Sequence, residues 1–195
     1  MIEIHGLRAC PFAWRVRLAA REKGLRYDWI AYDAPEPDPR AAQHNAERKS
    51  PKIWEDGYSL IESLVISQYL DEAHPGRRLQ PEDARARAAL RLRLELIAAA
   101  IVGHVTPELP ADARLVGRVQ KGHRGLDQAL SQGDPWMGGL EPDLSDLMIW
   151  PFLVQLEEAG VRIPDRFGRA RAYLERVRTH PSFTATDPTS EARAR

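Results

Sequence analysis

The only cysteine in the chain, Cys10, stands between a short apolar alternation and the start of a helical pattern. Pro11 follows at the first helical position, where proline is tolerated because the first N–H groups of a helix have no partner within it. These N–H groups and the positive end of the helix dipole would face the sulfur and favour thiolate over thiol. Arg15 and Arg17 add positive charge nearby. An isolated cysteine is more often a small buried hydrophobe, but the proline and the preceding strand favour a reactive group here.

No second cysteine stands where a dithiol motif would place it, because that position is Ala13. A disulfide formed at Cys10 must therefore be resolved by an external thiol. This arrangement points to glutathione-dependent chemistry rather than dithiol chemistry.

Length and composition indicate a folded protein rather than a disordered one. The chain has 195 residues, with 43% hydrophobic and 29% charged, and 28 basic residues balance 28 acidic ones. This length allows one large domain or two small ones. With no net charge, nothing attracts the chain to nucleic acid or to an anionic membrane, and we expect neither partner.

The expected cell compartment and the expected absence of a metal both depend on features that are missing from the sequence. It has no apolar run of about 18 residues and no secretory signal at its start. A single cysteine cannot form an internal disulfide, so we expect a cytoplasmic protein. One cysteine and six scattered histidines form no ligand set for structural zinc, so we expect no metal.

The elements around Cys10 are expected to form a small α/β unit in the order β-α-β-α-β-β-α. Period-two and helical spacings alternate through this part of the chain, and Asp56-Gly57 is a strong hairpin signal. The expected elements are strands over residues 2–5, 27–32, 53–55 and 58–61, and helices over 11–23, 40–46 and about 65–73.

A helical region follows a linker rich in proline and glycine. We expect a first domain over residues 1–76, a linker over 77–82 and an all-α domain over 83–195. Within the second domain, helices are expected through the stripe 90–101, over about 112–130, from about 143 and over about 166–178.

Several motifs resemble the omega-class and related, cysteine-type glutathione transferases. Residues 8–18 match the N-terminal signature, in which Cys-Pro-Phe-Ala precedes arginines and a leucine. Further matches, in register, lie at 50–53, 55–57, 60–63, 66–72 and 75–76. The resemblance covers the whole chain in domain order and is strongest over about the first 80 residues. It implies a thioredoxin-like domain with a mixed sheet, then an all-α domain, glutathione as co-substrate and a homodimer.

The resemblance also implies roles for four residues of the first domain. Pro51 aligns with the family's cis-proline, and Ser50 before it would offer its N–H and C=O to the cysteinyl part of glutathione. Glu62 and Ser63 resemble the Glu-Ser pair at a helix start. Ser63 and nearby N–H groups would hold the γ-glutamyl carboxylate, and Glu62 its ammonium group. The family usually has valine where Ser50 stands.

Two further residues are assigned to the glutathione site with an equally good alternative for each. Lys49 would pair with the glycyl carboxylate, or is a solvated surface lysine. Phe12 would pack under the ligand, or belongs to the core. Other transferase classes use an activating hydroxyl, and none stands at that place here; Tyr27 and Tyr32 come too late, on the second expected strand.

In the second domain, Asp143 and Asp146 resemble the family's capping box at the start of a buried helix. Asp143 would cap the helix, and the carboxylate of Asp146 would reach back to the backbone N–H of Asp143. This is a folding element and not a catalytic one.

The leading interpretation is an enzyme that catalyses glutathione-dependent thiol transfer. A mixed disulfide of Cys10 with glutathione would form, and the second substrate would be a glutathionylated thiol or a small oxidised molecule. Two alternatives remain. Cys10 could only position glutathione for conjugation to an electrophile, or the chain could be a non-catalytic binding module of the same fold.

Overall fold

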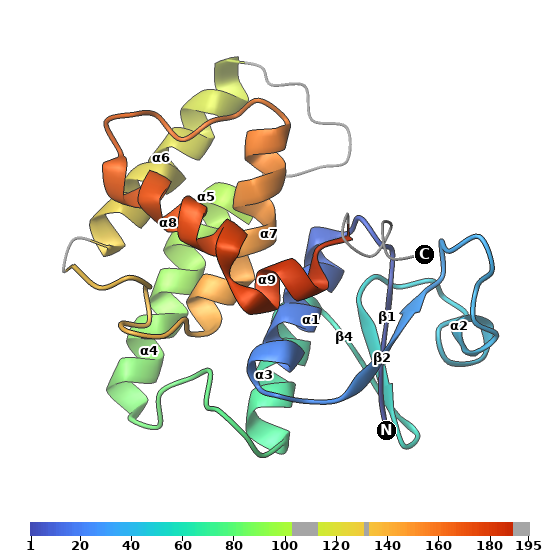
Figure 1. The fold of residues 1–195 in the computed structure, drawn as a ribbon. Coiled ribbons are helices and arrows are strands. Elements are labelled where there is room, and N and C mark those ends of the chain that lie inside the picture. The colour runs from blue at the N-terminus through green and yellow to red at the C-terminus, as the bar shows by residue number, and fades with distance from the viewer. Residues whose placement is uncertain (103–112, 131–132, 189–195) are drawn as a thin grey trace. The chain divides into compact units, whose positions relative to one another are not determined.

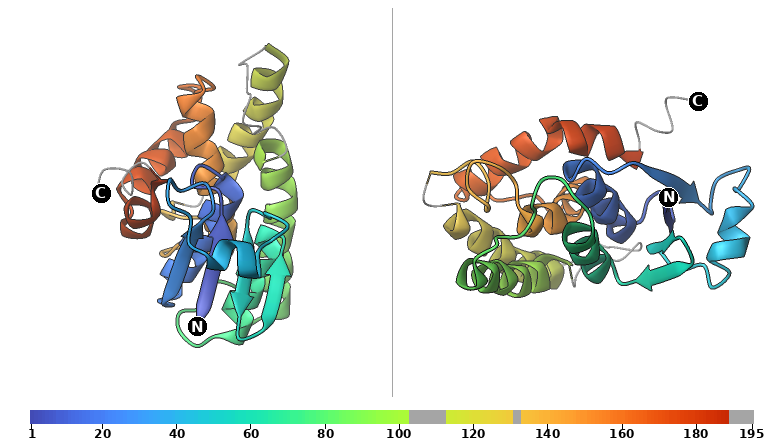
Figure 2. Two further views of the ribbon diagram at one scale, coloured as in Figure 1. Left: turned by 90° about the vertical axis from the view of Figure 1, so that its right-hand side faces the viewer. Right: turned by 90° about the horizontal axis from the view of Figure 1, so that it is seen from below.

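The computed structural model describes residues 1–102, 113–130 and 133–188. Their contacts divide the chain into two compact units, Met1–Leu79 together with the segment from Pro181, and Gln80–His180 (Figures 1 and 2). Among the described residues, none of the helices is long and apolar enough to cross a membrane.

The first unit is built on a mixed sheet of four strands. The strands are β1 (Ile2–Gly6), β2 (Tyr27–Ala31), β3 (Lys52–Glu55) and β4 (Tyr58–Ile61), in the order β2-β1-β3-β4. β1 pairs parallel with β2 and antiparallel with β3, and β3 pairs antiparallel with β4. With α1 (Pro11–Glu22), α2 (Arg40–His44) and α3 (Ser63–Ala73), the expected order of elements and the thioredoxin-like fold are confirmed.

The two faces of this sheet differ in chemistry. Ile2 and Ile4 of β1 pack in an apolar core with Val16 of α1 and with Ile66 and Leu70 of α3. Side chains alternate across a strand, so the other residues of β1, at positions 3 and 5, lie on the opposite face. Figure 1 and the right-hand view of Figure 2 show α1 and α3 on one side of the strands and α2 on the other.

The second unit is helical, as expected. It contains α4 (Ala84–Arg93), a π-helical turn η1 (Leu94–Ala98), α5 (Ala99–Ile101), α6 (Ala113–Ala129), α7 (Leu144–Glu158) and α8 (Gly168–Thr179). The expected start of α6 near residue 112 lies outside the described residues. α7 is buried along almost its whole length, which explains why it carries apolar residues all round.

The last described helix, α9 (Pro181–Thr186), differs from the sequence-based domain assignment. We expected all residues after 82 in the helical domain, but α9 packs on α1 of the first unit. The indole N–H of Trp14 donates to the Thr186 hydroxyl at 2.9 Å, and the Phe183 ring lies 4.6 Å from the Trp14 ring. Trp14 thus obtains both a polar and an apolar partner from a segment far along the chain.

Candidate active site

Cys10 lies where β1 ends and α1 begins. It is the N-cap of α1, and its carbonyl accepts the hydrogen bond from Trp14 N at 3.0 Å, while Pro11 occupies the first turn. The side chain is half-buried, and the thiol donates to the carbonyl oxygen of Ser50 at 3.7 Å. The fold therefore places the sulfur at a helix start, beside the loop that contains Ser50.

The Ser50–Pro51 peptide bond is cis, which confirms the expectation from the motif. The Ser50 hydroxyl accepts a hydrogen bond from Leu7 N at 2.9 Å, and its carbonyl faces Cys10. Ser50 thus ties its loop to the end of β1. The serine that replaces the usual valine has a structural function of its own.

A glycine makes this junction possible. A Cβ atom on Gly6 would lie 2.7 Å from the Ala13 Cβ and 2.9 Å from the Ser50 hydroxyl oxygen. Only a residue without a side chain allows β1, α1 and the Ser50 loop to meet so closely. Gly6 was not identified from the sequence, because its neighbours come from three separate segments.

The loop before Ser50 is held by a buried asparagine. The Asn45 side chain donates to Lys49 O and accepts from Lys49 N, both at 2.9 Å. Lys49 itself is exposed, so its backbone is fixed while its ammonium group reaches solvent. The sequence analysis did not single out Asn45; an asparagine in a loop is a weak signal because such residues commonly bond local backbone.

A cavity of about 220 Å³ is lined by Ser50, the residue whose carbonyl oxygen accepts from the Cys10 thiol; Cys10 itself is not among the lining residues. All six residues assigned to the glutathione site from the sequence line it, together with one that was not. The lining residues are Phe12, Lys49, Ser50, Pro51, Ile61, Glu62 and Ser63. They come from α1, the loop before β3, the end of β4 and the start of α3, so the fold brings together segments some 50 residues apart in the sequence.

The start of α3 forms one wall of this cavity. Glu62 is exposed and adopts φ 70° and ψ 105°, a left-handed backbone region that is costly for a residue with a side chain. Strain of this kind clusters at ligand sites because the surrounding structure must hold it. The next residue, Ser63, begins the helix, whose first N–H groups have no partner within it.

A buried arginine lies under the same wall. Arg15 of α1 donates from Nε to the Ser63 hydroxyl at 2.8 Å, and its guanidinium lies 5.0 Å from the centre of the Phe12 ring. Burial lowers the pKa of Arg15 to about 10, and the negative charges of Cys10 and Glu62 act in the opposite direction. The guanidinium therefore remains a cation between the cysteine and the start of α3. From the sequence, Arg15 was noted only as a nearby positive charge.

Tyr32 also belongs to the surroundings of Cys10, although its position on the sequence argued against this. Its hydroxyl donates to Arg48 O at 2.9 Å. Burial raises the pKa of Tyr32, a hydrogen bond with Ser50 lowers it, and the negative charge of Cys10 raises it further. Tyr32 directly follows β2, the strand parallel to β1, so its side chain approaches the same end of the sheet.

In the second unit, the capping box of α7 is confirmed. Asp143 accepts from the N–H groups of Ser145 and Asp146, and Asp146 accepts from Asp143 N at 2.9 Å. Asp146 also accepts from Met137 N at 2.9 Å and from the Tyr173 hydroxyl at 2.7 Å. Asp146 is therefore the centre of a buried polar network that joins three segments of this unit.

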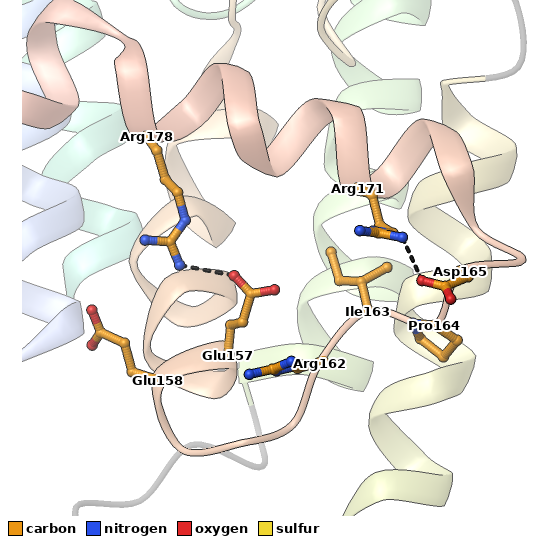
Figure 3. A pocket seen from close by; sticks show the side chains of 8 residues that line it. All are labelled: Glu157, Glu158, Arg162, Ile163, Pro164, Asp165, Arg171 and Arg178. Atoms are coloured by element: carbon orange, nitrogen blue, oxygen red, sulfur yellow. Dashed lines mark hydrogen bonds and ion pairs between the residues drawn. The ribbon is translucent and has the colours of Figure 1, made fainter.

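A second cavity, of about 680 Å³, lies in the helical unit. Four of its charged side chains form two ion pairs, Arg178 with Glu157 at 2.8 Å and Arg171 with Asp165 (Figure 3). The lining residues are Glu157, Glu158, Arg162, Ile163, Pro164, Asp165, Arg171 and Arg178. They include three acidic and three basic groups and no nucleophile, so the smaller cavity beside Cys10 is the candidate active site.

Both parts of the sequence are similar to known proteins. The family model "Glutathione S-transferase, N-terminal domain" matches residues 4–78, and "Glutathione S-transferase, C-terminal domain" matches residues 82–176. The glutathione S-transferase omega-1 of Sus scrofa is 28% identical over 163 residues, which cover 80% of this chain and 68% of that protein.

Solved structures show the same similarity. A crystal structure of glutathione transferase Omega 3C from Trametes versicolor has a TM-score of 0.79 at 20% identity, covering 95% of this chain and 88% of that one. A glutathione S-transferase from Methylobacillus flagellatus KT with GSH bound has a TM-score of 0.73 at 27% identity, covering 96% and 100%. Since the two family models together span most of the sequence, the chain belongs to the glutathione S-transferase family.

Proposed function

We propose that this chain is an omega-like glutathione transferase that uses Cys10 for thiol transfer. The observation that carries the proposal is the position of the Cys10 sulfur. It lies at the start of α1, 3.7 Å from Ser50 O, and Ser50 lines the cavity that the assigned glutathione residues share. A tripeptide thiol bound in this cavity would have its own sulfur next to that of Cys10.

The cavity offers a partner for each part of glutathione. The first N–H groups of α3 and the Ser63 hydroxyl suit the γ-glutamyl carboxylate, because a helix N-terminus attracts anions. The exposed Glu62 suits the ammonium group, and Lys49 suits the glycyl carboxylate. The backbone of Ser50 would pair with the cysteinyl residue, as an added strand would.

The chemistry consists of two thiol–disulfide exchanges. The Cys10 thiolate attacks the glutathione sulfur of a mixed disulfide, so that the substrate leaves as a thiolate and takes up a proton. The thiolate of a second glutathione then attacks the glutathione sulfur of the adduct, which releases glutathione disulfide and restores Cys10. The external thiol is required because the chain has no second cysteine.

We also propose a cytoplasmic homodimer. Both units expose large apolar side chains on helices, Val65 on α3 and Leu92 on α4, with exposed fractions of 47% and 58%. Contact with a second copy would remove this apolar surface from water. Sedimentation at micromolar concentration tests the dimer, and a monomer of 22 kDa would contradict it.

Intact mass after incubation with glutathione disulfide tests the function. We expect one added glutathione on the parent chain and none on Cys10→Ala, with thiol transfer lost in the variant. If no adduct forms and Cys10→Ala keeps its transfer rate, the cysteine mechanism is wrong and conjugation replaces it. If the parent chain neither binds immobilised glutathione nor catalyses thiol transfer, it is a non-catalytic binding module.

A further inference from the structure

Three potential metal ligands meet on the face of the sheet opposite α1 and α3. Glu3 and His5 point from β1 toward α2, which contributes His44. The Glu3 Oε2 atom lies 2.9 Å from His5 Nε2 and 2.7 Å from His44 Nδ1, and one ligand atom from each residue lies within 4.8 Å of the others. The two histidines are 39 positions apart in the sequence, and only the fold brings them together.

The donor set suits a cation of the zinc class. Carboxylate oxygen and imidazole nitrogen are ligands that zinc prefers in proteins, and the cluster provides one carboxylate and two imidazoles close to one another.

The three side chains are held by rigid surroundings. His5 is fully buried and sits in a strand paired on both sides, with Ile30 and with Lys52. The ring of His44 stacks on Trp54 at 4.0 Å with an interplanar angle of 6°. Ligands fixed in this way lose little freedom when an ion binds.

One nitrogen of His5 lies outside the hydrogen-bond network. The Nδ1 atom is buried without a hydrogen-bond partner among the described residues. The other nitrogen, Nε2, points at Glu3, and Nε2 is therefore the atom of this ring that an ion would bind.

The positive charges near the cluster are themselves neutralised. Arg40 contacts the other Glu3 oxygen, Oε1, at 3.3 Å, but it also pairs with Asp28 at 2.6 Å and with Asp38 at 2.7 Å. Lys52, which faces His5 across the sheet register, pairs with Glu47 at 2.9 Å. Together with Glu3, the carboxylates around the site outnumber the cations.

We propose that Glu3, His5 and His44 bind one divalent transition-metal ion of the zinc class. Zinc bonds of about 2.0–2.2 Å in a tetrahedral site place the ligand atoms about 3.3 Å apart. The present separations of 2.7 and 2.9 Å require the side chains to move apart by roughly half an ångström. Water would complete the coordination, and the ion would tie α2 to the sheet.

The test uses Zn²⁺ and Co²⁺ with tag-free protein treated with a chelator. We expect one ion per chain by calorimetry, a higher melting temperature with Zn²⁺, and a Co²⁺ spectrum without the thiolate charge-transfer band. Repeating the measurement with Cys10→Ala excludes binding at the cysteine, and the stoichiometry should not change.

The decisive variants are His44→Gln and Glu3→Gln, with His74→Gln as the matched control. His74 also pairs with a carboxylate, Glu55, at 3.2 Å, but in the described part of the chain this pair belongs to no group of three potential ligands. Zinc affinity should fall by about tenfold or more in the first two variants and stay unchanged in the control. His44 is partly exposed, so its variant should fold, which circular dichroism can check. If the parent chain binds no ion, or if the ion survives both ligand variants, the proposal is wrong.

Discussion

The Nε atom of Arg15 donates to the Ser63 hydroxyl at 2.8 Å and thereby joins the helix that begins beside Cys10 to the helix that begins at Ser63. Because the hydroxyl oxygen accepts from the guanidinium, its own proton is free to be donated to a ligand. The carbonyl of Ser63 is separately bound by the Ser67 hydroxyl at 2.8 Å. Arg15 therefore controls the direction in which Ser63 can donate.

We predict that Arg15→Met weakens glutathione binding about tenfold or more, since a hydrogen bond to a charged group contributes about 1.5–3 kcal/mol. The matched control is Arg17→Met. Arg17 is also a buried arginine of α1, but its guanidinium lies over the Trp29 ring at 4.5 Å, whereas that of Arg15 bonds Ser63, which lines the cavity. Calorimetry should show a changed dissociation constant only for Arg15→Met; equal affinities for both variants and the parent would remove Arg15 from the site.

Glu62 allows binding to be separated from stability. Glycine adopts a positive φ without the strain that Glu62 carries, so Glu62→Gly should melt at the same temperature or higher. The same change removes the carboxylate and should weaken glutathione binding by about 1.5–3 kcal/mol.

The control for Glu62 is Asp56→Gly. Asp56 also has a positive φ, 48°, in the turn between β3 and β4, and it does not line the cavity. Its substitution should leave the affinity for glutathione unchanged. A Glu62→Gly variant that binds like the parent would show that Glu62 is not a ligand-binding residue.

Asp146 should contribute to the stability of the fold and not to the binding of glutathione. Loss of a capping residue costs about 1–2 kcal/mol, but Asp146→Ala also leaves the N–H of Met137 and the Tyr173 hydroxyl without their acceptor. We therefore expect a loss of about 3 kcal/mol or more in urea unfolding.

Asp127→Ala serves as the comparison for Asp146. Asp127 accepts from the first N–H groups of α8, from Arg169 at 2.9 Å and Ala170 at 3.1 Å, at a more exposed position. The Asp127→Ala variant should lose about 1 kcal/mol of unfolding free energy. Equal losses in the two variants would mean that the additional bonds of Asp146 contribute nothing.

His123 predicts a pH dependence. Burial lowers its pKa to about 4, and the charge of Glu157 opposes this only weakly. The unfolded chain has the ordinary value of about 6.5, so below that pH the unfolded state binds more protons than the folded state. The contribution of neutral His123 to the free energy of unfolding is thus fully present above about pH 6.5. It is lost as the pH falls toward about 4.

The size of this loss of stability can be measured with His123→Leu, whose side chain cannot be protonated. Between about pH 7.5 and about pH 5 the parent should lose about 2 kcal/mol more stability than the variant. Parallel pH curves for the two proteins would show that His123 is not a buried neutral imidazole.

The parts of the fold and the site that could be predicted are those determined by residues close together in the sequence. Cys10-Pro11, Ser50-Pro51 and Glu62-Ser63 are local motifs. The structure places the last two pairs in the lining of a single cavity, and the Cys10 thiol donates to the carbonyl oxygen of Ser50. The capping box of α7 was predictable for the same reason, because its two members are three positions apart.

What could not be predicted depends on contacts between distant segments. Gly6 needs to be small only because Ala13 and Ser50 approach it. Likewise, Tyr32 becomes a neighbour of Ser50 only when β2 pairs with β1. The sequence pattern of α9 is that of any short helix, and nothing in it reveals that Trp14 is its partner.

A final prediction concerns where glutathione lies relative to Cys10. S-methylglutathione cannot exchange disulfides, so it should bind in the cavity and shield the Cys10 sulfur from a neutral alkylating reagent. At about ten times its dissociation constant it occupies about nine-tenths of the sites, and alkylation should slow about tenfold.

Two controls locate the ligand that causes this protection. S-methylcysteinylglycine lacks the γ-glutamyl group that the start of α3 would hold, so at the same concentration it should protect Cys10 weakly. In Glu62→Gly, more S-methylglutathione should be needed for equal protection, in proportion to the weaker binding. Protection requires only that the ligand covers the sulfur, so this result does not depend on catalysis. If calorimetry shows S-methylglutathione bound while Cys10 is alkylated at an unchanged rate, the ligand occupies another part of the molecule, and the assignment of the cavity to glutathione is wrong.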